Sequence, residues 1–407
     1  MAATWVTRTV VGIVLATFFS DVGHEMVTAV LPLYLASVGL GPAALGIMEG
    51  AADLAFSLSK LAGGAVGHRV KRKRPWMSAG YLVTTLGTGL IALARSATAV
   101  IPLRTVAWFG RGFRSPLRDF LLADEVGSTH FGRAYGFERT ADMIGAVVGP
   151  LLAALMVWSG ASLRAVILWS MAPSAISAAA ALLLTRDRPE AEAPAEAPAA
   201  QAAATAAAGE ADAKPTAFPR AYWLFLGGVL LFGLGDFSRT FLIVLAARAL
   251  GGGDIGAVLS TAVLLYAGHN LVSALAAYPA GKLGDAGSKA RVLVTGYALG
   301  VVTNVTLALA GASLPWLVVA IVMSGVYIAI EETLEKAVVA QLLPRERRSL
   351  GLGVLASANA LGDLGSSLCV GLLLSAGHPS LAFLLPAAVG GLGVIWMIGL
   401  VARGTLR

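Results

Sequence analysis

The sequence predicts an all-α membrane protein of twelve transmembrane helices, arranged as two similar six-helix bundles. Three observations predict this class. Of the 407 residues, 57% are hydrophobic and only 13% are charged, unlike an ordinary soluble domain. Twelve apolar runs are long enough to cross a bilayer, which takes roughly 20 residues each. The second half of the chain also repeats the pattern of the first half.

The apolar runs fall into two sets of six. The predicted spans of the first set are 9–37, 44–66, 76–95, 99–125, 135–158 and 163–184. Those of the second set are 222–249, 255–281, 291–311, 315–342, 350–376 and 380–402. The runs are continuous rather than alternating, which excludes a β-barrel. The first run is longer than a signal-peptide core and no cleavage motif follows it, so we expect it to remain as a helix.

A polar segment separates the two sets. The stretch PEAEAPAEAPAAQAAATAAAGEADAKP is rich in Ala, Pro and Glu and has no apolar face. It cannot bury enough surface to fold alone. We therefore expect a disordered cytoplasmic linker over 186–220, between an N-terminal bundle, 1–185, and a C-terminal bundle, 221–407.

Basic residues between the spans are distributed unevenly. If both termini are cytoplasmic, the outer turns hold only Arg95, Arg164 and Arg248. The inner loops then hold the remaining set: Arg69, Lys71, Arg72, Lys73, Arg74, Arg133, Arg186, Arg188, Lys282, Lys289, Arg291, Arg345, Arg347, Arg348 and Arg403. Cytoplasmic loops are enriched in Lys and Arg, so this bias predicts both termini inside. It also accounts for the net charge of +7 without nucleic acid.

The two halves match at an offset of 217 residues. GAVGHRVKRKR (64–74) corresponds to GKLGDAGSKAR (281–291). The same offset lays 133–149 over the segment around 349–367. It pairs the following residues: Gly136 with Gly353, Asp142 with Asn359, and Gly145 with Gly362. Two related six-helix halves joined by a long tether are typical of secondary transporters.

Two motifs resemble those of the major facilitator superfamily, and the resemblance covers essentially the whole chain. GGAVGHRVKRKR is similar to the family's loop between helices 2 and 3, Gly-x-x-x-Asp-Arg-x-Gly-Arg-Arg/Lys. His68 stands where the family has Asp, Arg69 matches, and the second-half copy keeps the acid as Asp285. The resemblance implies the major facilitator fold, transport by alternating access and a cytoplasmic latch at this loop.

The second motif, GAVVGPLLAA (145–154), resembles the family's antiporter signature on helix 5. Gly145, Gly149 and Pro150 match, whereas Ala153 and Ala154 replace the final glycines. This similarity implies proton antiport. Arg104 lies near the depth of the family's helix 4 arginine, and Trp108 stands in place of that arginine's partner glycine.

Ionisable residues occur inside the spans, where each costs roughly 2.5–3.5 kcal/mol on insertion scales. Asp21, His24 and Glu25 share one helical face, so they must turn toward a hydrated cavity or one another. We predict that Asp21, Glu25 and His24 carry a coupled proton with Asp142 as partner. A structural clamp between helices 1 and 5 is the alternative. Asp142 could also pair with Arg139 within its own helix.

Helix 4 carries a row of arginines. Arg104, Arg111 and Arg118 recur every seven residues, with Arg114 on much the same face. Forked guanidinium donors suit a carboxylate or phosphate substrate, although they could pair with acids of neighbouring helices instead. At the repeat offset, Arg114 corresponds to Glu331 and Arg118 to Glu335. Helix 10, the predicted span 315–342, is therefore acidic where helix 4, the span 99–125, is basic.

Two groups of residues follow from this reasoning. The predicted substrate-binding residues are Arg104, Arg111, Arg114, Asp236, Arg239, His269, Glu331 and Asn359. The predicted gating residues are Glu49, Asp53, Arg69, Arg118, Asp285 and Glu335. Glu49 and Asp53 could contact the substrate instead of forming gating salt bridges. His269 could form an interhelical hydrogen bond instead of binding the substrate.

We therefore expect a proton-coupled secondary transporter that exports a small amphipathic or anionic organic molecule by proton antiport. The proton gradient replaces any cofactor, and the partners are the substrate, protons and the lipid bilayer. We expect a monomer in the bacterial inner membrane. One alternative is a ferroportin-like exporter of divalent transition metals, with Asp21, His24, Glu25 and His269 as ligands. Another is a lipid or lysolipid flippase.

Other classes find no support in the sequence. It shows no phosphate-binding loop, no serine elbow and no HExxH motif, so we expect neither an enzyme nor an ATP-driven pump. Its single cysteine, Cys369, allows no intrachain disulfide and no cysteine-based metal site.

Overall fold

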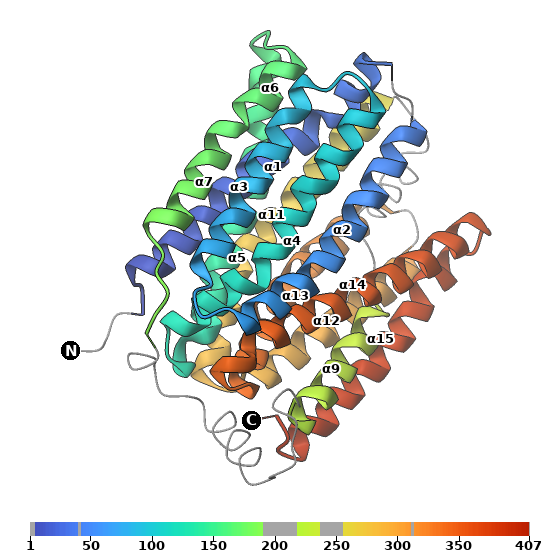
Figure 1. Cartoon of the computed structure of the whole chain (residues 1–407). Helices are drawn as coiled ribbons and strands as arrows, with labels where there is room; N and C mark the ends of the chain where they lie inside the picture. Colours follow the sequence, from blue (N-terminus) through green and yellow to red (C-terminus); the bar gives the residue numbers. More distant parts are fainter. Residues whose placement is uncertain (1–4, 40–41, 190–217, 237–254, 311–312, 407) are drawn as a thin grey trace. The chain divides into compact units, whose positions relative to one another are not determined.

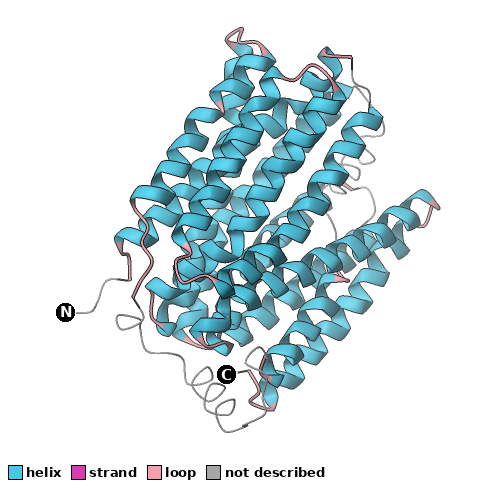
Figure 2. Ribbon diagram, in the orientation of Figure 1, coloured by secondary structure: helices cyan, strands magenta, loops and turns pink. Residues whose placement is uncertain are grey.

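The chain folds into helices, as predicted (Figure 1). The computed structural model describes residues 5–39, 42–189, 218–236, 255–310 and 313–406. Within these ranges there is no strand (Figure 2). Arg239, Arg248 and nearly all of the predicted linker lie outside the described residues.

The first six predicted spans are present as helices, and the sixth is divided at Ser170. They are α1 (Arg8–Ser37), α2 (Pro42–Arg69), α3 (Arg74–Leu90), α4 (Ala97–Glu125), α5 (Phe131–Trp158), α6 (Leu163–Trp169) and α7 (Met171–Leu183). Short 3₁₀ turns, Ile91–Leu93 and Ser128–His130, follow α3 and precede α5.

The second set of spans also forms helices within the residues that the structure describes. Its members are α9 (Arg220–Gly233), α11 (Ile255–Ala286), α12 (Lys289–Ala310), α13 (Leu314–Leu342), α14 (Arg345–Ser375) and α15 (Pro379–Ala402). α9 ends at Gly233, well before the predicted limit of 249, whereas α11 continues to Ala286 and α14 begins at Arg345. Residues 237–249 of that predicted span lie outside the described residues. Eight helices of the described residues are long and apolar enough to cross a membrane. The all-α membrane fold is therefore confirmed.

Local sequence explains several helix ends. At the start of α1 the Thr7 side chain accepts a hydrogen bond from the Val10 N–H at 3.3 Å. Ser162 does the same for Ala165 at the start of α6, at 3.2 Å. Such side chains satisfy N–H groups that have no partner inside the helix. After α5, Gly160 adopts a φ of +90°, a conformation that suits glycine.

The residues group into two compact units. Unit 1 comprises Met1–His130, Ala141–Ala197 and Pro344–Ser357. Unit 2 comprises Phe131–Thr140, Pro198–Leu343 and Ala358–Arg407. Unit 1 therefore includes the beginning of α14, and unit 2 includes the beginning of α5.

Each unit contains a close backbone contact made by repeat-related glycines. In unit 1, a Cβ on Gly64 of α2 would lie 3.0 Å from the Gly353 Cα of α14. In unit 2, a Cβ on Gly136 of α5 would lie 3.0 Å from the Tyr278 Cα of α11. Gly281 of α11 also meets the α5 backbone. Because 64 corresponds to 281 and 136 to 353, the sequence repeat specifies the same kind of helix contact twice.

Candidate functional site

The core of the candidate site in unit 1 is a buried ion pair beside a second acid. Asp21 of α1 is 3% exposed and pairs with the Arg111 guanidinium of α4. The Asp142 carboxyl of α5 is an acidic neighbour of Asp21. The structure therefore shows the predicted contact of Asp142 with helix 1.

Glycines bring α5 close enough to α1 for this contact. A Cβ on Gly145 would lie 3.0 Å from the Asp21 Cβ. A Cβ on Gly149 would lie 2.8 Å from the Glu25 Cβ and 2.7 Å from the Val22 carbonyl oxygen. All three distances are shorter than ordinary Cβ contacts. The two glycines of the helix 5 motif thus have a packing role beside both predicted proton carriers.

Arg104, which precedes Arg111 on α4, forms a second ion pair. It is 1% exposed, and its Nη2 lies 3.3 Å from Glu49 Oε1 of α2. The same nitrogen lies 3.4 Å from the Thr28 hydroxyl of α1. Glu25 interacts electrostatically with both Arg104 and Arg111. Each of these two arginines of α4 therefore has an acid as its ion-pair partner and Glu25 as a further acidic neighbour.

Several donors around these pairs have no protein acceptor. In the part of the chain that the structure describes, Arg104 Nε and Nη1, Arg111 Nη1 and Trp108 Nε1 are buried without a hydrogen-bond partner. Leaving a buried donor unpaired costs roughly 1–3 kcal/mol. These unpaired donors come from three residues of α4. They could donate hydrogen bonds to the oxygen atoms of an anion.

Trp108 lies at the centre of an aromatic cluster. Its ring centroid is 5.1 Å from the His24 ring and 5.1 Å from the Phe56 ring, both edge to face. The Arg104 guanidinium carbon lies 5.2 Å from the Trp108 ring centroid. His24, only 6% exposed, therefore packs on an aromatic face, and the cluster supplies apolar surface next to the unpaired donors.

The two inner arginines of α4 are held more firmly. Arg114 donates to the Ser20 hydroxyl at 2.6 Å and lies 3.7 Å above the Tyr81 ring. Arg118 forms two hydrogen bonds with its neighbour Asp119, at 3.0 and 2.9 Å. The α4 row thus contains two residues with spare donors followed by two that are fixed by local contacts.

The remaining predicted gating residues of unit 1 lie on α2. Glu49 has a side chain 36% exposed, and Asp53 is exposed one turn later. Arg69 is exposed in the last turn. Beside it, His68 Nδ1 lies 2.8 Å from the Glu346 carbonyl oxygen of α14. This contact stands where the family motif has an acid.

Unit 2 holds a corresponding cluster that is acidic. Tyr327 donates to Asp236 at 2.7 Å, and Asn359 donates to Glu335 at 2.6 Å. Tyr297 also donates to Glu335. Glu331, 8% exposed, has as its charged neighbours four acids: Glu335, Asp236, Asp363 and Glu332. α13 therefore has the acidic side chains that the repeat predicted for helix 10.

Arg139 pairs with a residue that the sequence did not single out. Its two terminal nitrogens lie 2.6 and 2.7 Å from the two carboxyl oxygens of Glu332. Tyr297 and Tyr327 were also missed, because a tyrosine in an apolar helix gives no sign of its partner.

Asp285 of unit 2 binds the beginning of α5. It accepts hydrogen bonds from the Gly132 and Arg133 N–H groups, each at 2.8 Å. Lys289 Nζ lies 3.1 Å from the same carboxylate. A carboxylate at a helix N-terminus is stabilised by unpaired N–H groups and by the helix dipole. The acid of the second-half loop therefore fastens α5 to α11.

His269 lies in a separate polar group of unit 2. It is fully buried, with Nε2 3.1 Å from the Ser324 hydroxyl and Nδ1 3.4 Å from Asn270 Oδ1. Among the described residues, no three His, Cys, Asp or Glu side chains are grouped so as to hold a metal ion. The alternative metal ligands Asp21, His24 and Glu25 belong to unit 1, with Asp21 on Arg111 and His24 on Trp108.

Comparison with known proteins gives matches along the chain. The model of the Major Facilitator Superfamily matches residues 13–268 and 234–405. An uncharacterised protein of Mycobacterium tuberculosis is 26% identical over 378 residues, covering 91% of this chain and 87% of that protein. The multi-drug resistance efflux pump PmrA homologue of Lactococcus lactis is 30% identical over 150 residues, covering 35% of this chain and 36% of that protein.

Solved structures show the same fold. The human organic anion transporter MFSD10 (TETRAN) superposes with a TM-score of 0.75 at 16% identity, covering 96% of this chain and 99% of that chain. The fucose:proton symporter FucP of Escherichia coli gives a TM-score of 0.73 at 13% identity, with 98% of each chain covered.

Proposed function

The chain belongs to the major facilitator superfamily, and from this membership we propose that it is a proton-coupled secondary transporter of a small organic anion. Family and fold make it a multi-pass membrane transporter rather than an enzyme. In this proposal the chain works as a monomer by alternating access, in a bacterial inner membrane with both termini in the cytoplasm. No cofactor takes part.

The observation that supports the anion most is the set of buried donors without acceptors on α4. A carboxylate could accept from Arg104, Arg111 and Trp108 together, and an apolar body could rest on the aromatic cluster. Charge-assisted hydrogen bonds of this kind are among the stronger polar contacts in proteins. The human structural neighbour is an organic anion transporter, which agrees with this class.

Arg111 couples the anion to a proton. It is the ion-pair partner of Asp21, so an anion that takes over Arg111 leaves Asp21 without its cation. A buried charge without a partner is neutralised rather than kept, so Asp21 takes up a proton, with Asp142 beside it. The anion and the proton therefore bind together, and a lower pH strengthens anion binding.

Export by proton antiport is a second candidate, favoured by two observations. Gly145, Gly149 and Pro150 match the antiporter signature, and one relative is named as a multidrug efflux pump homologue. Antiport requires the substrate and the proton to compete for one group. A cationic amphipathic substrate would compete in this way for Asp21 and Asp142, so the sign of the pH effect distinguishes the two candidates.

A liposome assay tests coupling. In Asp21→Asn, flux driven by a pH gradient should be abolished, whereas exchange of substrate across the membrane at equal pH should persist. Glu346→Gln, which neutralises an acid at the start of α14, serves as the control and should retain gradient-driven flux. Normal gradient-driven flux in Asp21→Asn would overturn the proposal. Substrate affinity measured between pH 5 and 8 then distinguishes the two candidates. An anion that binds together with a proton should bind more tightly at low pH, whereas a substrate that competes with the proton should bind more weakly.

A further inference from the structure

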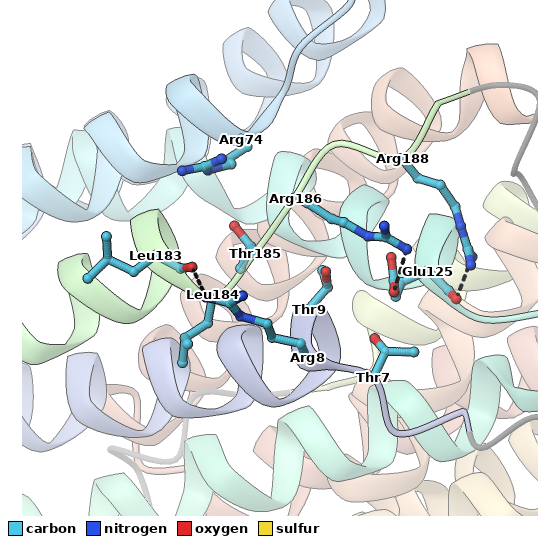
Figure 3. Close-up of a pocket in the computed structure, with 10 residues that line it drawn as sticks. All are labelled: Thr7, Arg8, Thr9, Arg74, Glu125, Leu183, Leu184, Thr185, Arg186 and Arg188. Atoms are coloured by element: carbon cyan, nitrogen blue, oxygen red, sulfur yellow. Dashed lines mark hydrogen bonds and ion pairs between the residues drawn. The ribbon is translucent and has the colours of Figure 1, made fainter.

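A second charged site lies at one end of unit 1, where α1 begins and α4 and α7 end. The structure contains a cavity of about 460 Å³ there (Figure 3). This volume is within the range of ligand pockets, roughly 300–1,000 Å³. Four arginines line it and a single acid, Glu125, opposes them. The arginines are Arg8, Arg74, Arg186 and Arg188.

The arginines use part of their hydrogen-bonding capacity on helix ends. Arg8 donates to the Leu183 carbonyl oxygen at 2.9 Å, and Arg188 Nη1 donates to the Glu125 carbonyl oxygen at 2.8 Å. Each guanidinium has five N–H donors, so these bonds leave others available. Within the described residues, Arg188 Nε is buried and meets no acceptor.

The charge of the lining is unbalanced. Arg186 Nη2 approaches Glu125 Oε1 only to 3.9 Å, and the Arg186 side chain is 55% exposed. One carboxylate therefore faces four guanidinium groups. In the view of Figure 3, the Thr9 and Thr185 side chains appear between Arg8 and Arg186. Capping of helix ends accounts for the bonds to carbonyl oxygens, but it does not account for this excess of positive charge around a cavity.

Apolar side chains flank the same end of the unit. Leu183 lines the cavity and is 64% exposed. Its neighbour Leu182 is 48% exposed, and Trp76, in the first turn of α3, is 47% exposed. Tryptophan at the end of a transmembrane helix is typical of the membrane interface. A ligand of this cavity would therefore meet positive charge and hydrocarbon at once.

We propose that this cavity binds the phosphate-bearing headgroup of an anionic phospholipid, whose acyl chains lie against the exposed apolar side chains of α7 and α3. Guanidinium forks match phosphate oxygens in geometry and charge. Basic pockets at helix ends near the membrane surface suit such headgroups. The site is independent of the substrate proposed above, because its lining includes none of Asp21, Arg104, Trp108 and Arg111.

Lipid titration of the purified full chain in detergent tests the site, with bound lipid counted by native mass spectrometry. The probes are dioctanoyl phosphatidylglycerol, dioctanoyl phosphatidylcholine and inorganic phosphate. The wild type should bind phosphatidylglycerol in preference to phosphatidylcholine. In Arg8→Gln/Arg186→Gln the affinity for phosphatidylglycerol should fall about thirtyfold, the effect of two surface charges. The control Arg291→Gln/Arg403→Gln removes two exposed arginines of unit 2 and should bind as the wild type does.

Three results would overturn the proposal. One is equal binding of the two lipids, and another is unchanged affinity in Arg8→Gln/Arg186→Gln. The third is saturation by inorganic phosphate that displaces phosphatidylglycerol, which would make free phosphate the ligand. If the double variant shows no thermal unfolding transition, Arg186→Gln alone carries the test, because that side chain is largely exposed. It should still weaken phosphatidylglycerol binding, about fivefold.

Discussion

Trp108 illustrates how much depends on a single residue in this bundle. The sequence shows it as a large residue where related transporters have glycine, which reads as a departure from the motif. In the structure its indole contacts His24, Phe56 and the Arg104 guanidinium, and its Nε1–H is buried without an acceptor. One side chain therefore joins the predicted proton carriers to the arginine row and adds a donor of its own.

Trp108→Phe removes this donor and keeps an aromatic ring in place. We expect anion binding to weaken roughly ten- to hundredfold, the value of one hydrogen bond to a charged group. The dissociation constant can be measured by calorimetry on purified protein. Trp76→Phe, at an exposed position on α3, is the matched control and should bind normally. Equal affinities in the two variants would show that the indole N–H does not contact the anion.

Lys73, in the loop between α2 and α3, shows the cost of burying charge near the membrane surface. Burial lowers the pKa of Lys73, and the attraction of Asp124 does not offset this effect. A lysine with a lowered pKa binds fewer protons when folded than when unfolded, so stability rises as pH increases from the folded pKa toward 10.5.

Lys73→Met should therefore raise the thermal midpoint at neutral pH and reduce the gain in stability at alkaline pH. Thermal unfolding at a series of pH values measures both effects. Lys71→Met, at an exposed position in the same loop, should change neither. A lower midpoint in Lys73→Met at pH 7 would show that the contacts of Lys73 with Val70 and Phe120 outweigh its burial.

At the scale of helices, glycines decide how closely the elements approach. The α1–α5 contact brings Asp142 to Asp21 because Gly145 and Gly149 have no side chain. Any larger residue at these positions would separate the predicted proton carriers as well as the helices. The helix 5 motif is thus a packing motif whose consequence is the chemistry of the site.

Gly149→Ala tests this link. The new Cβ would lie 2.7 Å from the Val22 carbonyl oxygen, so α1 and α5 must separate, and such overpacking costs about 1–3 kcal/mol. We expect a lower thermal midpoint and slower gradient-driven flux. Gly227→Ala, on α9 with nothing within 4 Å of the added Cβ, should be neutral or slightly stabilising. A midpoint in Gly149→Ala equal to that of the control would contradict the packing role.

At the scale of the whole molecule, the repeat places related contacts in both units while the charges differ. Unit 1 carries the α4 arginines and unit 2 carries the acids of α13. The glycine contacts are alike: Gly64 meets α14 in unit 1, and Gly281 meets α5 in unit 2. The repeat therefore preserves the backbone geometry and varies the chemistry built on it.

Gly64→Ala and Gly281→Ala should have equivalent effects if these contacts have the same role. Each added Cβ would collide with the backbone of the facing helix, so we expect both variants to transport more slowly, measured by flux into liposomes. Gly268→Ala, on α11 with open space around the added Cβ, should transport normally. An effect of only one of the two changes would show that the repeated contacts are not equivalent.

The sequence by itself determined the class of the protein: an all-α membrane fold, the repeat, which helices carry charge, and the limits of the described helices other than α9 to within about a turn or two. These features depend on hydropathy and periodicity, which can be read from neighbouring residues in the chain. Only the tertiary structure decided the partners. That Asp142 meets Asp21, that Arg139 pairs with Glu332, and that four arginines surround a cavity depends on distances between helices far apart in the chain. Helical spacing fixes the face on which a residue lies, but the packing of the helices selects the side chain opposite.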